Sequence, residues 1–137
     1  MAIQITLANY HHGATGISLM RPSPLGNPFD WKGLGIATTA LVRVADRDEA
    51  LAQYALWLRL QMASETAAMA ELQRLVALAR RQPITLLCGC LPKPCHLVLV
   101  RDALTWLDAQ PTFVPGVTPV PRLRYVAPLR PQHDLFG

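Results

Sequence analysis

The sequence predicts an α/β domain with a small, mostly parallel sheet and flanking helices in a Rossmann-like three-layer arrangement. Three features support this class: a strand-like opening segment, a middle region with helical periodicity, and the continuous apolar segment Ile84–Cys88 before another helical stretch. The chain has 137 residues, 51% hydrophobic and 16% charged, which is enough to bury one core. We expect a single α/β domain over residues 1–110 and a proline-rich extended tail over residues 111–137.

The N-terminal part is expected to contain two short strands separated by loops. Apolar and polar residues alternate in Ala2–Ala8, and the segment is rich in β-branched residues, which predicts a strand. Ile17–Met20 predicts a second strand and leads into Arg21–Phe29, with the sequence RPSPLGNPF. Three prolines and a Gly-Asn pair exclude regular structure in this nonapeptide, which we call the proline loop.

Three helices are expected in the rest of the domain. Asp46 and Glu49 have the spacing of a capping box, and the residues behind it have helical periodicity. A second helix should begin near Ser64 and end before Pro83, and a third should cover residues 96–109. The residues expected on the buried faces of the first two helices are Leu51, Tyr54, Ala55, Leu58 and Met62, then Ala68, Leu72, Leu75, Val76 and Ala79.

Prolines recur from Pro111 onward, so the tail cannot be helical. Val120–Val126 could form an edge strand; otherwise the tail is an extended arm over its own domain or over a neighbouring subunit. We expect it to lie outside the core. An arm of this kind can also hold a homodimer together.

Composition limits the partners and the compartment. The net charge is +4, and the thirteen basic residues are mostly arginines, which favours a small anionic ligand. Nucleic acid is not indicated by so small a charge, and no apolar segment is long enough to span a membrane. With no targeting signal and no disulfide-like cysteine spacing, we expect a cytoplasmic protein.

All three cysteines lie in the sequence LLCGCLPKPCH, at the end of the apolar strand and the start of the third helix. We call residues 88–96 the cysteine turn. Cys95 precedes a helix beside His96, a setting that favours a thiolate, so we interpret Cys95 as a nucleophile or contact residue and His96 as its proton partner. The alternative is a buried, unreactive thiol cluster.

Zinc is a third interpretation of the cysteine turn. Cys88, Cys90, Cys95 and His96 offer the four ligands of a tetrahedral ion. The spacing is unusual for zinc, however, and adjacent Cys95 and His96 are expected to converge poorly if both lie in the first helical turn. The sequence therefore assigns no metal ligand and no cofactor, and zinc stays an alternative.

The proline loop offers groups that suit an anion. Arg21, Ser23 and Asn27 can donate hydrogen bonds, and Gly26 allows a ligand close to the backbone. The sequence contains neither of the two glycine-rich phosphate-binding motifs, G-x-x-x-x-G-K-S/T and G-x-G-x-x-G. Cys88 and Cys90 are expected to line the same site, because loops that follow parallel strands share one sheet edge. An ordinary proline-rich corner is the alternative.

Together, the two motifs resemble domain-of-unknown-function family 4326, whose members are small bacterial and phage proteins. The resemblance covers about residues 15–108 and implies a compact α/β domain with both motifs facing one pocket, but it implies no reaction. The chain departs from the family at Gly89, where an aromatic residue is usual, and at Leu97 and Val98, where a small residue and an aspartate are common.

We therefore expect a protein that binds a nucleotide-like or phosphorylated small molecule between the proline loop and the cysteine turn, with cysteine chemistry as an open question. Whether it is an enzyme is not decided by the sequence. The alternative is a non-catalytic zinc-binding or protein-interaction module of phage or mobile-element origin.

Overall fold

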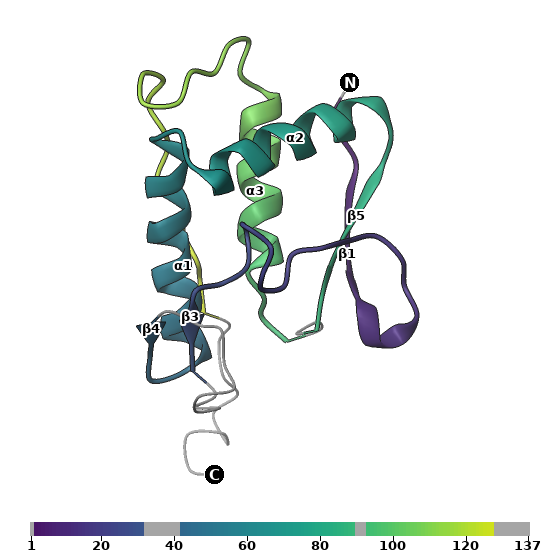
Figure 1. The fold of residues 1–137 in the computed structure, drawn as a ribbon, viewed down its shortest axis with the longest axis vertical. Coiled ribbons are helices and arrows are strands. Elements are labelled where there is room, and N and C mark those ends of the chain that lie inside the picture. The colour runs from purple at the N-terminus through teal and green to yellow at the C-terminus, as the bar shows by residue number, and fades with distance from the viewer. Residues whose placement is uncertain (1, 32–41, 90–92, 128–137) are drawn as a thin grey trace.

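The computed structural model describes residues 2–31, 42–89 and 93–127 (Figure 1). Helices and strands follow one another in an order that confirms the predicted α/β class. The elements are β1 (Ile5–Asn9), the short 3-10 helix η1 (Tyr10–His12), β2 (Ile17–Ser18), β3 (Phe29–Asp30), β4 (Val42–Arg43), α1 (Arg47–Met62), α2 (Ala67–Arg81), β5 (Ile84–Cys88) and α3 (Leu97–Asp108).

The main sheet is parallel, with β5 between β1 and β2. This central position explains why every residue of β5 except the partly buried Thr85 is apolar and buried, and it confirms the expectation of a buried parallel strand. The register places Asn9 opposite Cys88 and Ser18 opposite Leu87. The carboxyl ends of all three strands therefore lie level, and the loops that follow them leave from one edge. A second sheet pairs β3 with β4, also in parallel.

The helices begin at side-chain caps. At α1, Asp46 Oδ1 accepts a hydrogen bond from the Glu49 amide at 2.8 Å, and Glu49 Oε2 accepts one from the Ala45 amide at 3.1 Å. At α2, Thr66 Oγ1 accepts from the Met69 amide at 3.1 Å, so this helix begins slightly later than expected. All the residues predicted for the buried faces of α1 and α2 are buried.

The core lies where the helices meet the sheet. α3 packs against α2 and against β1 and β5, while α1 packs against α2 and β3 (Figure 1). The proline loop enters this core through Leu25, which has no exposed surface. No helix among the described residues has the length and apolar character to cross a membrane.

The described part of the tail, residues 111–127, has neither helix nor strand and runs over its own domain. Arg59 of α1 donates to the Val120 carbonyl at 3.3 Å, and the Tyr125 hydroxyl donates to Asp48 Oδ1 at 2.7 Å. Leu123 is 8% exposed and belongs to the core. The expectation that the chain beyond Pro111 lies outside the core is therefore wrong. Prolines remove backbone donors, but they do not prevent a neighbouring leucine from being buried.

We predict that Leu123→Ala lowers the free energy of unfolding by about 2 kcal/mol, because it leaves a cavity under the tail. Val126→Ala is the matched control, since Val126 is 80% exposed, and it should change stability by less than about 0.5 kcal/mol. Urea denaturation measures both variants. Equally small effects would show that the tail does not contribute to the core.

We also predict that Tyr125 makes stability fall at alkaline pH. Partial burial, the hydrogen bond to Asp48 and the charge of Asp48 raise the pKa of Tyr125 to about 12. Unfolded tyrosine ionises near pH 10, so between pH 10 and 12 the unfolded state releases a proton that the folded state keeps. The free energy of unfolding should thus decrease over this range, and less steeply in Tyr125→Phe. Identical slopes in chemical denaturation would contradict this assignment.

Candidate functional site

Three side chains with metal-ligating or nucleophilic atoms meet at the carboxyl end of β5. Cys88 ends the strand, and Cys95 and His96 precede α3; all three are buried. Their sulfur and ring nitrogen atoms lie within 4.8 Å of one another. We call these residues the Cys–His cluster. Cys95 and His96 are expected to converge poorly only if both lie in the first helical turn, and that condition is not met, because the regular helix begins at Leu97 and both residues come before it.

The ring of His96 is oriented by a backbone carbonyl. His96 Nε2 lies 2.9 Å from the carbonyl oxygen of Leu19, which can only accept, so we place the ring proton on Nε2. His96 Nδ1 then turns its lone pair toward Cys95 Sγ, 3.6 Å away. The imidazole can serve at this atom as a base, as a hydrogen-bond acceptor or as a ligand.

Tyr54 of α1 connects the cluster with the proline loop. Its hydroxyl donates to the carbonyl of Leu25 at 2.7 Å, and its ring meets that of His96 edge-on, with 5.1 Å between centroids. Burial, followed by the nearby thiol groups of Cys95 and Cys88, raises the pKa of Tyr54 well above its usual value. Sequence periodicity identified Tyr54 only as a core residue. A buried tyrosine hydroxyl needs a hydrogen-bond partner, and this requirement could have indicated that Tyr54 contacts another segment.

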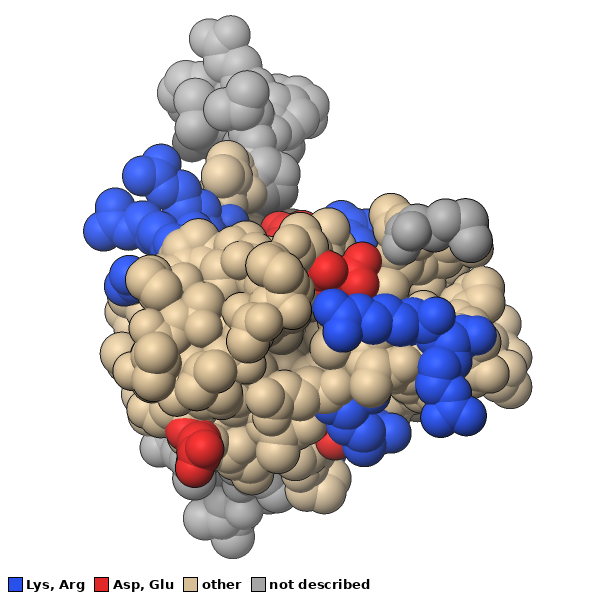
Figure 2. Space-filling view, turned by 90° about the horizontal axis from the view of Figure 1, so that it is seen from above, with Lys and Arg blue, Asp and Glu red and all other residues tan. Residues whose placement is uncertain are grey.

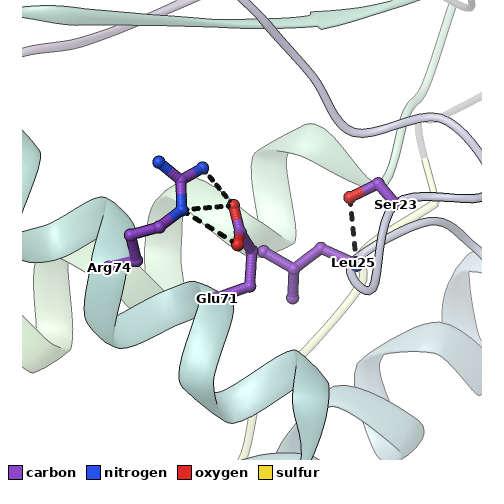
Figure 3. Close-up of polar contacts among 4 residues, drawn as sticks. All are labelled: Ser23, Leu25, Glu71 and Arg74. Carbon is purple, nitrogen blue, oxygen red and sulfur yellow. Dashed lines mark hydrogen bonds and ion pairs between the residues drawn. The ribbon is translucent and has the colours of Figure 1, made fainter.

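The proline loop is shaped by its own polar groups. Ser23 Oγ accepts from the Leu25 amide at 3.3 Å, and Asn27 Oδ1 accepts from the Phe29 amide at 2.9 Å. Figure 3 shows the first of these bonds, with the Leu25 side chain extending toward α2, the helix of the Glu71–Arg74 ion pair. The side chains of Ser23 and Asn27 thus have structural roles as turn-forming groups. Contact between them and a ligand stays a prediction.

Gly26 and Arg21 meet where the proline loop closes on itself. A Cβ atom on Gly26 would lie 2.8 Å from the backbone nitrogen of Arg21, so the close approach that requires glycine here is made by the protein itself. Arg21 Nη1 is buried and has no hydrogen-bond partner among the described residues. Of the loop residues predicted to bind a ligand, Arg21 therefore has the clearest unmet need for an acceptor.

The structure brings the segment that leads into the proline loop against the cysteine turn at the carboxyl edge of the sheet. The Leu19 amide donates to the Leu87 carbonyl at 3.0 Å, and the Leu19 carbonyl faces His96. Cys90 lies outside the described residues.

Two further contacts reach the cysteine turn. Arg47 Nη1 donates to the carbonyl of Pro94 at 3.0 Å, while its guanidinium group lies over the ring of Trp31, 4.5 Å from the centroid. On the other side, a Cβ on Gly89 would lie 3.1 Å from the Tyr10 ring and 3.3 Å from His11 Nε2. The space beside Gly89 is thus taken by rings from η1.

This geometry defines the chain as a small α/β protein with a buried thiol–imidazole cluster beside an arginine-bearing loop. A family model described as a domain of unknown function, DUF4326, matches residues 5–106. The chain belongs to this family, and the matched region includes both the proline loop and the cysteine turn. No curated protein and no solved structure matches the chain.

We predict that Tyr54→Phe lowers the free energy of unfolding by about 1–3 kcal/mol, because it leaves the buried carbonyl of Leu25 without its donor. Tyr10→Phe is the control, since Tyr10 is 40% exposed, and it should have little effect. Thermal and urea unfolding of the two variants measure the difference. If both variants match the wild type, the Tyr54–Leu25 bond does not hold the loop.

Proposed function

We propose that the protein binds a small nucleotide-like or phosphorylated molecule where the proline loop meets the cysteine turn. The observation that carries this proposal is the buried Arg21 Nη1 without a hydrogen-bond partner among the described residues. A guanidinium nitrogen removed from water without an acceptor is costly. A phosphate group would supply acceptors in the paired geometry that arginine favours.

The amount and distribution of charge on the protein support a small ligand over a nucleic-acid strand. The net charge is only +4. On the face shown in Figure 2, the lysine and arginine side chains form separate groups, with acidic and uncharged surface between them. A polyanion is usually bound by a continuous basic stripe that contacts many phosphates. A single phosphorylated molecule needs only one or two well-placed arginines.

Thiol chemistry at Cys95 is a second candidate function. Its support is the 3.6 Å separation between Cys95 Sγ and His96 Nδ1, which allows the imidazole to take the thiol proton. Cys95 is only 3% exposed, so its thiol is largely covered from solvent. Limited alkylation with peptide mapping tests this candidate, which requires Cys95 to react before Cys88.

We predict that Arg21→Gln weakens binding of a nucleoside 5′-monophosphate by about 10–100-fold, since a hydrogen bond to a charged group contributes about 1.5–3 kcal/mol. Titration calorimetry with the full chain measures this, and the unphosphorylated nucleoside is the ligand control. Arg124→Gln is the protein control, because Arg124 is an exposed arginine of the tail, outside the proline loop.

Mass spectrometry of molecules that co-purify with the wild type would identify the ligand class directly. The proposal predicts phosphorylated species in that fraction. It is overturned if the wild type binds neither inorganic phosphate nor the nucleotide, or if Arg21→Gln binds both as well as the wild type does.

A further inference from the structure

We propose that Cys88, Cys95 and His96 hold a soft divalent metal ion of the zinc type, through the two sulfur atoms and His96 Nδ1. This inference goes beyond the phosphate site and does not depend on it. The observations that carry the two proposals involve different residues: Arg21 in the loop and the Cys–His cluster at the end of β5.

The separation of Cys95 Sγ and His96 Nδ1 suits a tetrahedral ion. With zinc–sulfur and zinc–nitrogen bonds of about 2.3 and 2.0–2.1 Å, tetrahedral angles place a sulfur and a nitrogen ligand about 3.6 Å apart. Cys95 Sγ and His96 Nδ1 are 3.6 Å apart. That separation alone would also suit a thiol–imidazole hydrogen bond. Cys88 Sγ is a third candidate ligand, because the ligand atoms of the three residues lie within 4.8 Å of one another and a two-residue hydrogen bond does not require Cys88. A bound ion would draw these atoms closer together, since tetrahedral zinc–sulfur bonds place two sulfur ligands about 3.8 Å apart.

The histidine is oriented as a metal ligand. Metal-binding histidines usually donate their second ring nitrogen to a carboxylate or a backbone carbonyl, which fixes the ring and leaves the other nitrogen to the ion. His96 does this with the carbonyl of Leu19, at 2.9 Å. This contact crosses 77 positions of the sequence and comes from a different strand end, so it is independent evidence that Nδ1 is directed into the cluster.

Charge and burial are consistent with this assignment. Cys88, Cys95 and His96 are each no more than 5% exposed. Two thiolates at such a place would be strongly unfavourable without a cation, whereas a divalent ion balances both charges. The fourth coordination position is not assigned. A metal here would join the end of β5 to the start of α3 and would keep Cys95 as a ligand, which would exclude the nucleophile function.

The test begins with the full-length wild-type protein, purified without chelator and weighed by native mass spectrometry. We expect about one zinc ion per chain, and after chelator treatment we expect added zinc to raise Tm. Cobalt(II) in place of zinc should give thiolate-to-metal charge-transfer absorption and the intense visible bands of a tetrahedral site. Failure of the wild type to bind zinc or cobalt overturns the proposal.

Variants locate the ion. Cys88→Ser and Cys95→Ser should each weaken zinc binding by more than the roughly 10–100-fold typical of losing an outer-shell partner. Arg21→Gln should keep zinc while losing phosphate binding, so failure of one proposal is distinguishable from failure of the other.

A spectroscopic measurement on the wild type covers the case in which a cysteine variant does not fold. X-ray absorption of the zinc-loaded protein should show both sulfur and imidazole in the first shell. A shell of nitrogen and oxygen only, as the exposed His11 and His12 would provide, overturns the proposal. So does a folded Cys95→Ser variant that binds zinc as tightly as the wild type.

Discussion

The hydrogen bond between His96 and the carbonyl of Leu19 couples the two halves of the candidate site. A buried imidazole needs a partner for its N–H group, and here the acceptor is backbone at the end of β2, just before the proline loop. The bond fixes the ring, and with it the direction of Nδ1 toward Cys95. It also holds the entrance of the loop against the start of α3. The orientation of His96 for either metal binding or thiol chemistry depends on this one contact.

Sequence reasoning succeeded where structure depends on neighbours along the chain. The apolar strand at 84–88, the capping box at Asp46 and the buried helix faces are local patterns of composition and spacing, and each was found. It failed where a side chain depends on a distant partner. The Tyr54–Leu25 bond and the burial of Leu123 cannot be read from periodicity, because spacing does not name the group that a residue will meet.

The proline loop shows how a motif can have structural and functional causes at once. Ser23 and Asn27 stabilise turns within the loop, and Gly26 is required because the backbone of Arg21 approaches it. These residue types would be needed even if nothing bound there. The sequence alone could not distinguish a role in forming the turns of the loop from a role in binding a ligand, since the same side chains can do either. Arg21 differs, because no turn explains a buried guanidinium nitrogen without an acceptor among the described residues.

At Gly89, where the chain departs from the family pattern, aromatic rings from another segment occupy the space beside the cysteine turn. Resembling sequences usually have an aromatic residue at this position of the cysteine turn, whereas here the rings of Tyr10 and His11 lie against the glycine. These two rings contact each other, with centroids 3.9 Å apart, and Asn9 beside them donates to the Gly89 carbonyl at 3.4 Å. A Cβ at position 89 would lie 3.1 Å from the Tyr10 ring, so that ring would have to shift by a few tenths of an ångström. Rings from η1 therefore cover the cysteine turn on this side, in place of an aromatic side chain of the turn itself. Their position depends on the register that sets the end of β1 level with the end of β5.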